Sequence, residues 1–292
     1  MRGLFTIILF LLFILFSFIV GIGVGLIFSR EDGFPVGERV AVLEVEGIIL
    51  DSQPYLDTLS KIKKDDGIKA IVLRIDSPGG AVGPSQEIYS EILKLREKKP
   101  VIATLGSVGA SGGYYIACAA QKILANPGTI TGSIGVIAQF VSYEQLLKWA
   151  KLDVEVIKSG EFKDVGSPFK KMTETEKQYM QQLIDNVYSQ FKLAVSKARG
   201  IDSKEMDKIA DGRIFTGEQA KNLKLIDELG TLSDAVNLAG SLSGIKGEPN
   251  VSYYPKKKIN FLDFILSKFE TEIISGLPLK ERFGFFYLVD IM

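Results

Sequence analysis

One short stretch, Gly109-Ala110-Ser111-Gly112-Gly113, combines residue types and spacing that could do hydrolytic chemistry. It fits the pattern Gly-x-Ser-x-Gly, in which a serine lies on a sharp turn between a strand and a helix. An apolar run at 101–105 precedes it and a helix-like run at 114–120 follows it. Small neighbours tolerate strained backbone angles and let a substrate approach closely. Ser111 is therefore a candidate nucleophile, although glycine-rich turns without chemistry are also common.

The chain contains no histidine, which restricts how such a serine could be activated. A Ser-His-Asp triad is impossible, so the hydroxyl proton must pass to a lysine, a carboxylate or a free amine. A lysine base must be neutral, and lowering its pKa from ~10.4 by about 3 pH units takes ~4 kcal/mol of burial. Four lysines lie in a loop-rich stretch, and the pattern does not choose among them: Lys158, Lys163, Lys170 and Lys171.

Two further turns of small residues could complete a site. The run Asp76-Ser77-Pro78-Gly79-Gly80 ends an apolar strand, and ligands gather at the carboxyl ends of parallel strands. Backbone amides of Gly80 and Gly112 could then serve as the two donors of an oxyanion hole. In the loop at 131–135, the hydroxyl of Ser133 could hold a base in place. Ordinary tight turns remain the alternative for both loops.

The elements that would position these residues alternate along the chain. Strands are expected at 40–45, 70–75 and 101–105, and helices at 55–64, 85–98 and 113–120, which predicts an α/β domain with a mostly parallel sheet. Short strands follow at 122–125, 154–158 and 226–230. Capping boxes at Ser142 and Thr173 each open a helix, Gly200 ends the second one, and Thr216 opens another.

Composition excludes several classes of function. A formal net charge of zero makes a nucleic-acid partner unexpected. The single cysteine, Cys118, excludes an internal disulfide and a cysteine-rich zinc site. Without histidine a zinc enzyme would need an unusual carboxylate shell, so we expect neither a metal nor another cofactor.

Both ends of the chain are apolar. No charged residue occurs between 3 and 29, a run longer than the ~20 residues that cross a bilayer, which predicts an uncleaved transmembrane anchor at 1–30 and a linker at 31–38. By the positive-inside rule, the flanking charges favour an orientation with the N-terminus in the cytoplasm and the body of the chain outside it. The tail at 244–292 joins a lysine run to an apolar stretch. A membrane-surface helix, packing on a neighbouring subunit and a core helix all remain open for it.

Taken together, these motifs resemble the signal peptide peptidase A family in its short, single-repeat form. The family consists of membrane-bound Ser-Lys serine proteases with a Clp protease/crotonase-like fold. The resemblance runs from about 40 to 238 and rests on 76–80, 109–115, 131–135, 158–164 and 211–217. It implies that Ser111 is the nucleophile, Lys163 the general base and Ser133 the residue that orients the lysine. Gly80 and Gly112 would form the oxyanion hole.

The same resemblance implies a function. Residues 39–243 would form a serine endopeptidase, held at the cell membrane by the anchor, that degrades apolar peptides, chiefly cleaved signal peptides. Family members form ring- or dome-shaped homo-oligomers, so the dyad would be shared between adjacent subunits, and the apolar tail could enter a neighbour's groove. The alternatives are a non-catalytic membrane scaffold of the same fold and a crotonase-like acyl-CoA enzyme.

Overall fold

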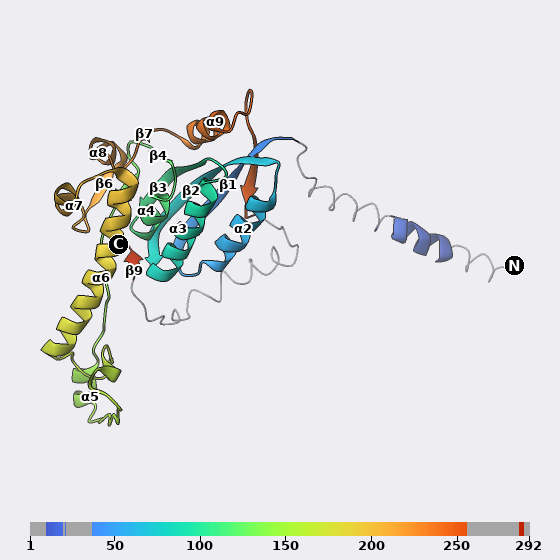
Figure 1. Ribbon diagram of the computed structural model, residues 1–292. Helices are drawn as coiled ribbons and strands as arrows, with labels where there is room; N and C mark the ends of the chain where they lie inside the picture. Colours follow the sequence, from blue (N-terminus) through green and yellow to red (C-terminus); the bar gives the residue numbers. More distant parts are fainter. Residues whose placement is uncertain (1–9, 20, 22–36, 256–285, 289–292) are drawn as a thin grey trace. The chain divides into compact units, whose positions relative to one another are not determined.

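The computed structural model describes residues 10–19, 21, 37–255 and 286–288 (Figure 1). The chain divides into two compact units, Met1–Gly37 and Glu38–Met292. Residues 10–19 of the first unit are helical and their apolar side chains are exposed. Within the described ranges, no helix is both long enough and apolar enough to cross a bilayer. The remainder of the predicted anchor, most of the linker and most of the tail after Pro255 lie outside the described residues.

Three long parallel strands form the centre of the second unit. They are β1 (Arg39–Ile49), β2 (Ile68–Ala81) and β3 (Val101–Ala110), connected by α2 (Gln53–Lys64) and α3 (Val82–Arg96). Residues Val40 to Leu43 of β1 are all fully buried, on both faces of the strand. Continuous burial of this kind is typical of a parallel sheet covered by helices on both sides. The α/β prediction is therefore confirmed.

Shorter strands extend the sheet on both sides. The order β6-β5-β3-β2-β1-β8 runs through β5 (Ile130–Gly132), β6 (Ile214–Thr216) and β8 (Asn250–Tyr254). The first half of β3 pairs with β4 (Lys122–Ala125), which pairs in turn with β7 (Glu228–Leu229). The last residues of β3 pair instead with β5. This change of partner brings the end of β3 against the end of β5.

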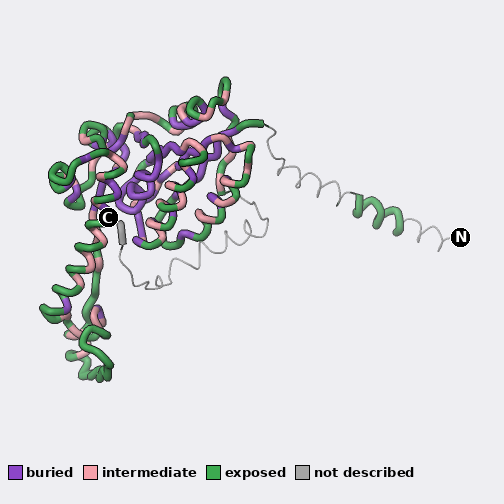
Figure 2. The backbone as a smooth tube through the Cα atoms, in the orientation of Figure 1, coloured by how far each residue is buried: buried purple, intermediate pink, exposed green. Residues whose placement is uncertain are grey.

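Helices cover both faces of the sheet. On one face, apolar residues of α2, α3 and α4 (Gly112–Ala117) pack with side chains from the central strands, among them Leu59, Ile92 and Ile116. On the other face, α9 (Leu232–Leu242) packs Ala235 and Ala239 against the sheet. Figure 2 shows that the buried residues concentrate around the sheet and α4. The end of β3 and the start of α4 are therefore held rigidly.

A long helix, α6 (Glu174–Arg199), begins and ends as its sequence predicts. The side chain of Thr173 and that of Glu176 form a reciprocal capping box, and Gly200 ends the helix with a left-handed φ of 64°. Phe191, in the second half of α6, is buried with its ring edge-on to Tyr115 at 5.1 Å. Two short helices follow, α7 (Ser203–Ile209) and α8 (Gly217–Asn222).

Residues 137–180, which we call the arm, contain α5 (Glu144–Trp149), the 3-10 turn η2 (Glu161–Asp164) and the first turns of α6. Figure 1 shows α5 at the end of α6 that is remote from α4, and Figure 2 shows that most of this region is exposed. Two local predictions are wrong here. The structure has no strand at 154–158, and α5 begins without a side-chain cap.

The chain returns to the sheet near its C-terminal end. Residues Phe286–Leu288 form β9, which pairs antiparallel with Gly79, Gly80 and Ala81 of β2. This strand pairs with the sheet of its own chain, and entry of the tail into a neighbour's groove stays a prediction.

Candidate active site

Ser111 occupies the junction between β3 and α4. Its backbone has φ 51° and ψ −118°, outside the regions that residues other than glycine readily adopt. Two backbone hydrogen bonds hold this conformation: the Ser111 amide donates to the carbonyl of Gly132, and the Tyr115 amide donates to the carbonyl of Ser111, both at 2.8 Å. The turn has the strained strand-to-helix geometry that the Gly-x-Ser-x-Gly pattern predicts.

The Ser111 hydroxyl is both buried and unpaired. The residue is 1% exposed, and its Oγ has no hydrogen-bond partner among the described residues. A buried hydroxyl that makes no hydrogen bond costs free energy, so proteins rarely retain one without a reason.

Gly80 and Gly112, the predicted oxyanion donors, lie at the same edge of the sheet. Gly112 is the first residue of α4, and Gly80 is the penultimate residue of β2. A Cβ added at Gly80 would lie 2.0 Å from the carbonyl oxygen of Ile49, and one at Gly113 would lie 2.9 Å from that of Ser77. Only glycine fits at these positions, because α4 and β1 both approach the end of β2 closely.

Ser77 braces this end of β2. Its buried hydroxyl donates to the carbonyl of Gly47 at 2.6 Å and accepts from the amide of Gly79 at 3.1 Å. Gly79 has φ 105°, a conformation that favours glycine. The hydroxyl of Ser77 thereby fixes the backbone that leads into Gly80. Pattern analysis missed this residue, because the bond to Gly47 joins two segments 30 positions apart.

Ser133 lies beside the nucleophile turn. It follows Gly132, whose carbonyl accepts a hydrogen bond from the Ser111 amide. The backbone amide of Ser133 donates to the backbone carbonyl of Arg213 at 2.9 Å. Like Ser111, it is buried and has a positive φ, here 50°. The structure thus brings Ser111, Gly112, Gly80 and Ser133 to one edge of the sheet.

Lys163 is not part of this group within one chain. It lies on η2 in the arm, it is exposed, and its ammonium makes no hydrogen bond or ion pair with any described residue. The unpaired Oγ of Ser111 shows that the two residues do not meet within the chain. Within one chain, no described side chain is therefore in place to accept the proton of Ser111.

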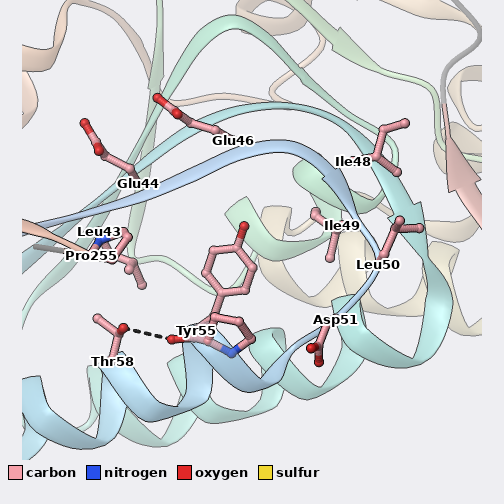
Figure 3. A pocket seen from close by; sticks show the side chains of 11 residues that line it. Leu43, Glu44, Glu46, Ile48, Ile49, Leu50, Asp51, Tyr55, Thr58 and Pro255 are labelled. Atoms are coloured by element: carbon pink, nitrogen blue, oxygen red, sulfur yellow. Dashed lines mark hydrogen bonds between the residues drawn. The ribbon is translucent and has the colours of Figure 1, made fainter. Parts of the chain in front are cut away.

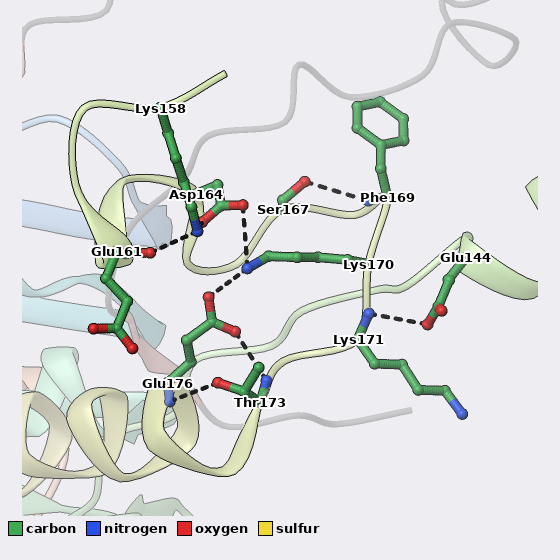
Figure 4. Close-up of polar contacts among 10 residues, drawn as sticks. All are labelled: Glu144, Lys158, Glu161, Asp164, Ser167, Phe169, Lys170, Lys171, Thr173 and Glu176. Carbon is green, nitrogen blue, oxygen red and sulfur yellow. Dashed lines mark hydrogen bonds and ion pairs between the residues drawn. The ribbon is translucent and has the colours of Figure 1, made fainter. Parts of the chain in front are cut away.

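Two of the other three candidate lysines pair with carboxylates through their ammonium groups, whereas Lys171 binds Glu144 through its backbone amide (Figure 4). Lys158 pairs with Asp164 at 2.7 Å, and Lys170 pairs with both Asp164 and Glu176. The hydrogen bond to Glu176 raises the pKa of Lys170. Opposite charges stabilise the ammonium form, which makes Lys170 a poor base. The pairing separates Lys158 and Lys170 from Lys163, whereas Lys171, like Lys163, makes no ion pair with a described residue.

One pocket of the described residues borders this edge, because its lining includes Ile48 and Ile49, which pair with Gly79 and Gly80 of β2. It has a volume of about 380 Å³ and sits between β1 and α2, where Figure 3 shows the Tyr55 ring between the strand and the helix. Its charged side chains are all acidic: Glu44, Glu46 and Asp51. None of the predicted site residues lines it, and it offers no nucleophile beside a base. We therefore place the candidate active site at Ser111.

A strained serine turn on a mostly parallel α/β sheet is the arrangement of the Clp protease class, and residues 50–129 match the Clp protease family model. Residues 94–246 match the model of peptidase family S49, which covers more than half of the chain. The chain belongs to peptidase family S49 and is a peptidase. The resemblance to the signal peptide peptidase A family is thereby confirmed.

Named relatives agree with this assignment. A "Putative protease" of Synechocystis sp. is 42% identical over 210 residues, which cover 71% of this chain and 76% of that protein. The "Putative signal peptide peptidase SppA" of Enterococcus faecium is 35% identical, covering 68% of this chain and 62% of its own length. "Serine protease SPPA, chloroplastic" of Arabidopsis thaliana is 32% identical, covering 70% of this chain and 30% of its own. The chain thus spans less than two thirds of the latter two relatives.

Proposed function

We propose that the protein is a membrane-anchored serine endopeptidase with a Ser-Lys dyad. The observation that carries the proposal is the Ser111 hydroxyl, which is buried and unpaired on a strained turn beside two glycine-only positions. The name of the Arabidopsis relative describes a serine protease, which supports the same chemistry. A chain without histidine requires a different base, and a lysine without a carboxylate partner is suited to that role.

The proposed mechanism uses the residues at the edge of the sheet. Neutral Lys163 accepts the proton of Ser111 while Oγ attacks the carbonyl carbon of a peptide bond. Amides of Gly80 and Gly112 stabilise the negative oxygen of the tetrahedral intermediate. The lysine ammonium then protonates the leaving amine, and the acyl-enzyme remains. Lys163 next deprotonates a water molecule, which hydrolyses the ester and regenerates Ser111, with Ser133 orienting the amine throughout.

In this proposal the base comes from a second copy of the chain. Lys163 does not reach its own Ser111, and the arm that carries it exposes large apolar side chains, including Trp149 at 82% and Ile157 at 94%. Burying such side chains stabilises an assembly by about 1.5–3 kcal/mol each. Apolar surface of this extent marks an interaction site. A closed ring or dome would bring each arm to the Ser111 of the next subunit.

Peptides fit the site better than acyl-CoA does. The antiparallel pairing of β9 with Gly79–Ala81 demonstrates that an extended chain can lie beside Gly80. Peptides bind sheet edges in this manner, through backbone hydrogen bonds. The apolar N-terminal run would keep the site at the membrane, where cleaved signal peptides remain, and the Enterococcus relative is named for such substrates.

The test is a direct comparison of substrates and probes. The full chain in detergent should cleave casein and an apolar signal peptide, leave acyl-CoA thioesters intact, and react with a fluorophosphonate probe. Ser111→Ala should abolish both cleavage and labelling. Thioester cleavage without proteolysis would favour the crotonase-like alternative, and complete inertness would favour the scaffold.

A further inference from the structure

The turn that carries Lys163 has little secondary structure to hold it. Between the end of α5 and the start of α6, the structure has a single 3-10 turn, η2. A lysine on a flexible loop would be a poor base, because misplacing a catalytic group by 1 Å can cost about 100-fold in rate. Other contacts must therefore fix this segment.

Asp164, the residue after Lys163, closes the turn. Its Oδ1 accepts a hydrogen bond from the Lys158 ammonium at 2.7 Å, and the same ammonium donates to the carbonyl of Glu161 at 2.8 Å. Lys158 thus bridges both ends of η2. The Asp164 side chain is only 14% exposed, so the ion pair is partly shielded from water.

A second bridge ties the turn to α6. The Lys170 ammonium lies 3.2 Å from Oδ2 of Asp164 and also binds Oε1 of Glu176. Oε2 of Glu176 accepts from the Thr173 amide at 2.9 Å, which places this carboxylate in the capping box of α6. The Glu176 side chain is 4% exposed. Figure 4 shows the resulting chain of contacts, from η2 through Asp164 and Lys170 into the first turn of the helix.

The arrangement also separates Lys163 from its acidic neighbour. Asp164 directs one oxygen to Lys158 and the other to Lys170, and it makes no ion pair with Lys163. A carboxylate paired with Lys163 would stabilise the ammonium and oppose its use as a base. The two carboxylates balance the two flanking lysines, while the adjacent amine is left to the active site.

We propose that Asp164 and Glu176 are positioning residues of the peptidase: together with Lys158 and Lys170 they fix η2 on α6 and present Lys163 to the active site. The inference rests on the proposed function, since it assigns a supporting role to residues around the proposed base. Neither carboxylate touches the substrate or the reacting atoms.

The test compares Asp164→Asn and Glu176→Gln with Glu174→Gln in the full assembled enzyme. Glu174 is the matched control, because it pairs with Lys177 at 3.2 Å in the same helical turn and has no ion pair with Lys158, Lys163 or Lys170. We expect both network variants to lower kcat about 10- to 100-fold with KM nearly unchanged, and the control to behave as the wild type. Asp164→Glu, which keeps the carboxylate, should recover part of the loss.

Rates are to be expressed per active site titrated with a fluorophosphonate, alongside particle size. If the variants lose kcat only in proportion to lost assembly, or if Asp164→Glu is no better than Asp164→Asn, the role is structural and the inference is wrong. The Lys163→Ala variant distinguishes a failure of the proposed Ser-Lys mechanism from a failure of the positioning role. An active Lys163→Ala enzyme would overturn the proposed function itself. If Lys163→Ala is inactive but the separate variants Asp164→Asn and Glu176→Gln both work at wild-type rates, only the positioning role is overturned.

Discussion

The backbone amide of Ser111 donates a hydrogen bond to the carbonyl of Gly132 at 2.8 Å, so the strand that precedes Ser133 also holds the nucleophile turn. The last residues of β3 pair with β5 next to this bond, whereas the first half of β3 pairs with β4. One backbone contact therefore sets the position of two proposed functional serines. The relationship makes the turn sensitive to any change that separates β3 from β5.

The first prediction concerns the dyad. Ser111→Ala and Lys163→Ala should each lower peptidase activity by at least about 100-fold, because each removes a group that takes part in proton transfer. Ser90→Ala and Lys208→Ala, at exposed positions on α3 and α7, serve as matched controls and should remain active. Activity is measured on a fluorogenic apolar peptide, with particle size determined in parallel.

A mixing experiment tests whether the dyad is shared. Particles reassembled from both inactive variants should recover part of the wild-type activity, because some interfaces would join an intact Ser111 to an intact Lys163. As the mixing ratio changes, the recovered peptidase activity should be proportional to the fraction of interfaces that join an intact Ser111 to an intact Lys163. If all mixed particles remain inactive at every ratio, the base does not come from the neighbouring subunit.

The second prediction concerns the proposed oxyanion hole. Gly80→Ala would place a Cβ 2.0 Å from the carbonyl oxygen of Ile49, so the end of β2 must shift. We expect a loss of kcat of about 100- to 1,000-fold, the usual effect of removing one oxyanion donor. Gly83→Ala is the matched control, since no atom lies within 4 Å of its added Cβ. Equal activity of the two variants would exclude Gly80 from the site.

The third prediction uses Trp149, the single tryptophan of the chain. Its side chain is 82% exposed on the arm, so its fluorescence in an isolated chain should be that of a hydrated indole. If the arm packs on a second copy, raising the protein concentration should shift the emission to shorter wavelength as particles form. The midpoint should coincide with that of peptidase activity. An emission spectrum that does not change across assembly would place the contact elsewhere.

The fourth prediction concerns β9. Removing residues 286–292 should lower the KM for peptides, because it removes a strand that already occupies the backbone of Gly79–Ala81. The matched control is a chain that lacks only residues 289–292 and keeps the strand. Initial rates over a range of peptide concentrations give the answer. Identical kinetics and cleavage patterns for both truncations would show that the tail does not compete with substrate.

The fifth prediction concerns stability and its pH dependence. The Arg199 side chain is 9% exposed and pairs at 2.8 Å with Asp227, which also accepts from the Ile123 amide. Burial opposes ionisation of Asp227, but the hydrogen bonds from Arg199 and Ile123 outweigh it and lower the pKa. Asp227→Ala should therefore reduce the free energy of unfolding by about 3 kcal/mol, because it leaves a buried guanidinium without its partner.

The sign of the pH effect follows from the lowered pKa of Asp227. Its contribution should be fully present above the unfolded value of about 4 and should be lost as the pH falls through the folded value. Chemical unfolding of wild type and Asp227→Ala at several pH values measures this difference. A difference that grows as the pH falls below 4 would contradict the assignment.

Local signals predicted the elements whose causes lie in neighbouring residues. Thr173 with Glu176, and Gly200, set both ends of α6, since a cap acts within one turn of the helix. The strand predicted at 154–158 is absent, because a strand depends on a partner that is distant in the sequence. Its residues have the composition of a strand, but a strand needs a partner, and the described residues provide none. Ile157 is accordingly 94% exposed instead of paired.

The site was predictable in part. Ser111 and Gly80 could be proposed because glycine-rich turns at strand ends have a readable pattern, and the parallel order of β2 and β3 brings both to one edge of the sheet. Lys163 was proposed as the base only through the family resemblance, because the four candidate lysines have the same local pattern, and this role stays a prediction. The pairing of β9 with β2 joins segments more than 200 residues apart, and no local rule specifies such a contact.

The separation of the arm from the Ser111 turn has a consequence for the cell. If the amine is supplied by a neighbour, a newly made chain is proteolytically inactive until it assembles with other copies, because its own chain offers no base to activate Ser111. Proteolysis would then begin only where enough copies have gathered, and dilution alone would stop it.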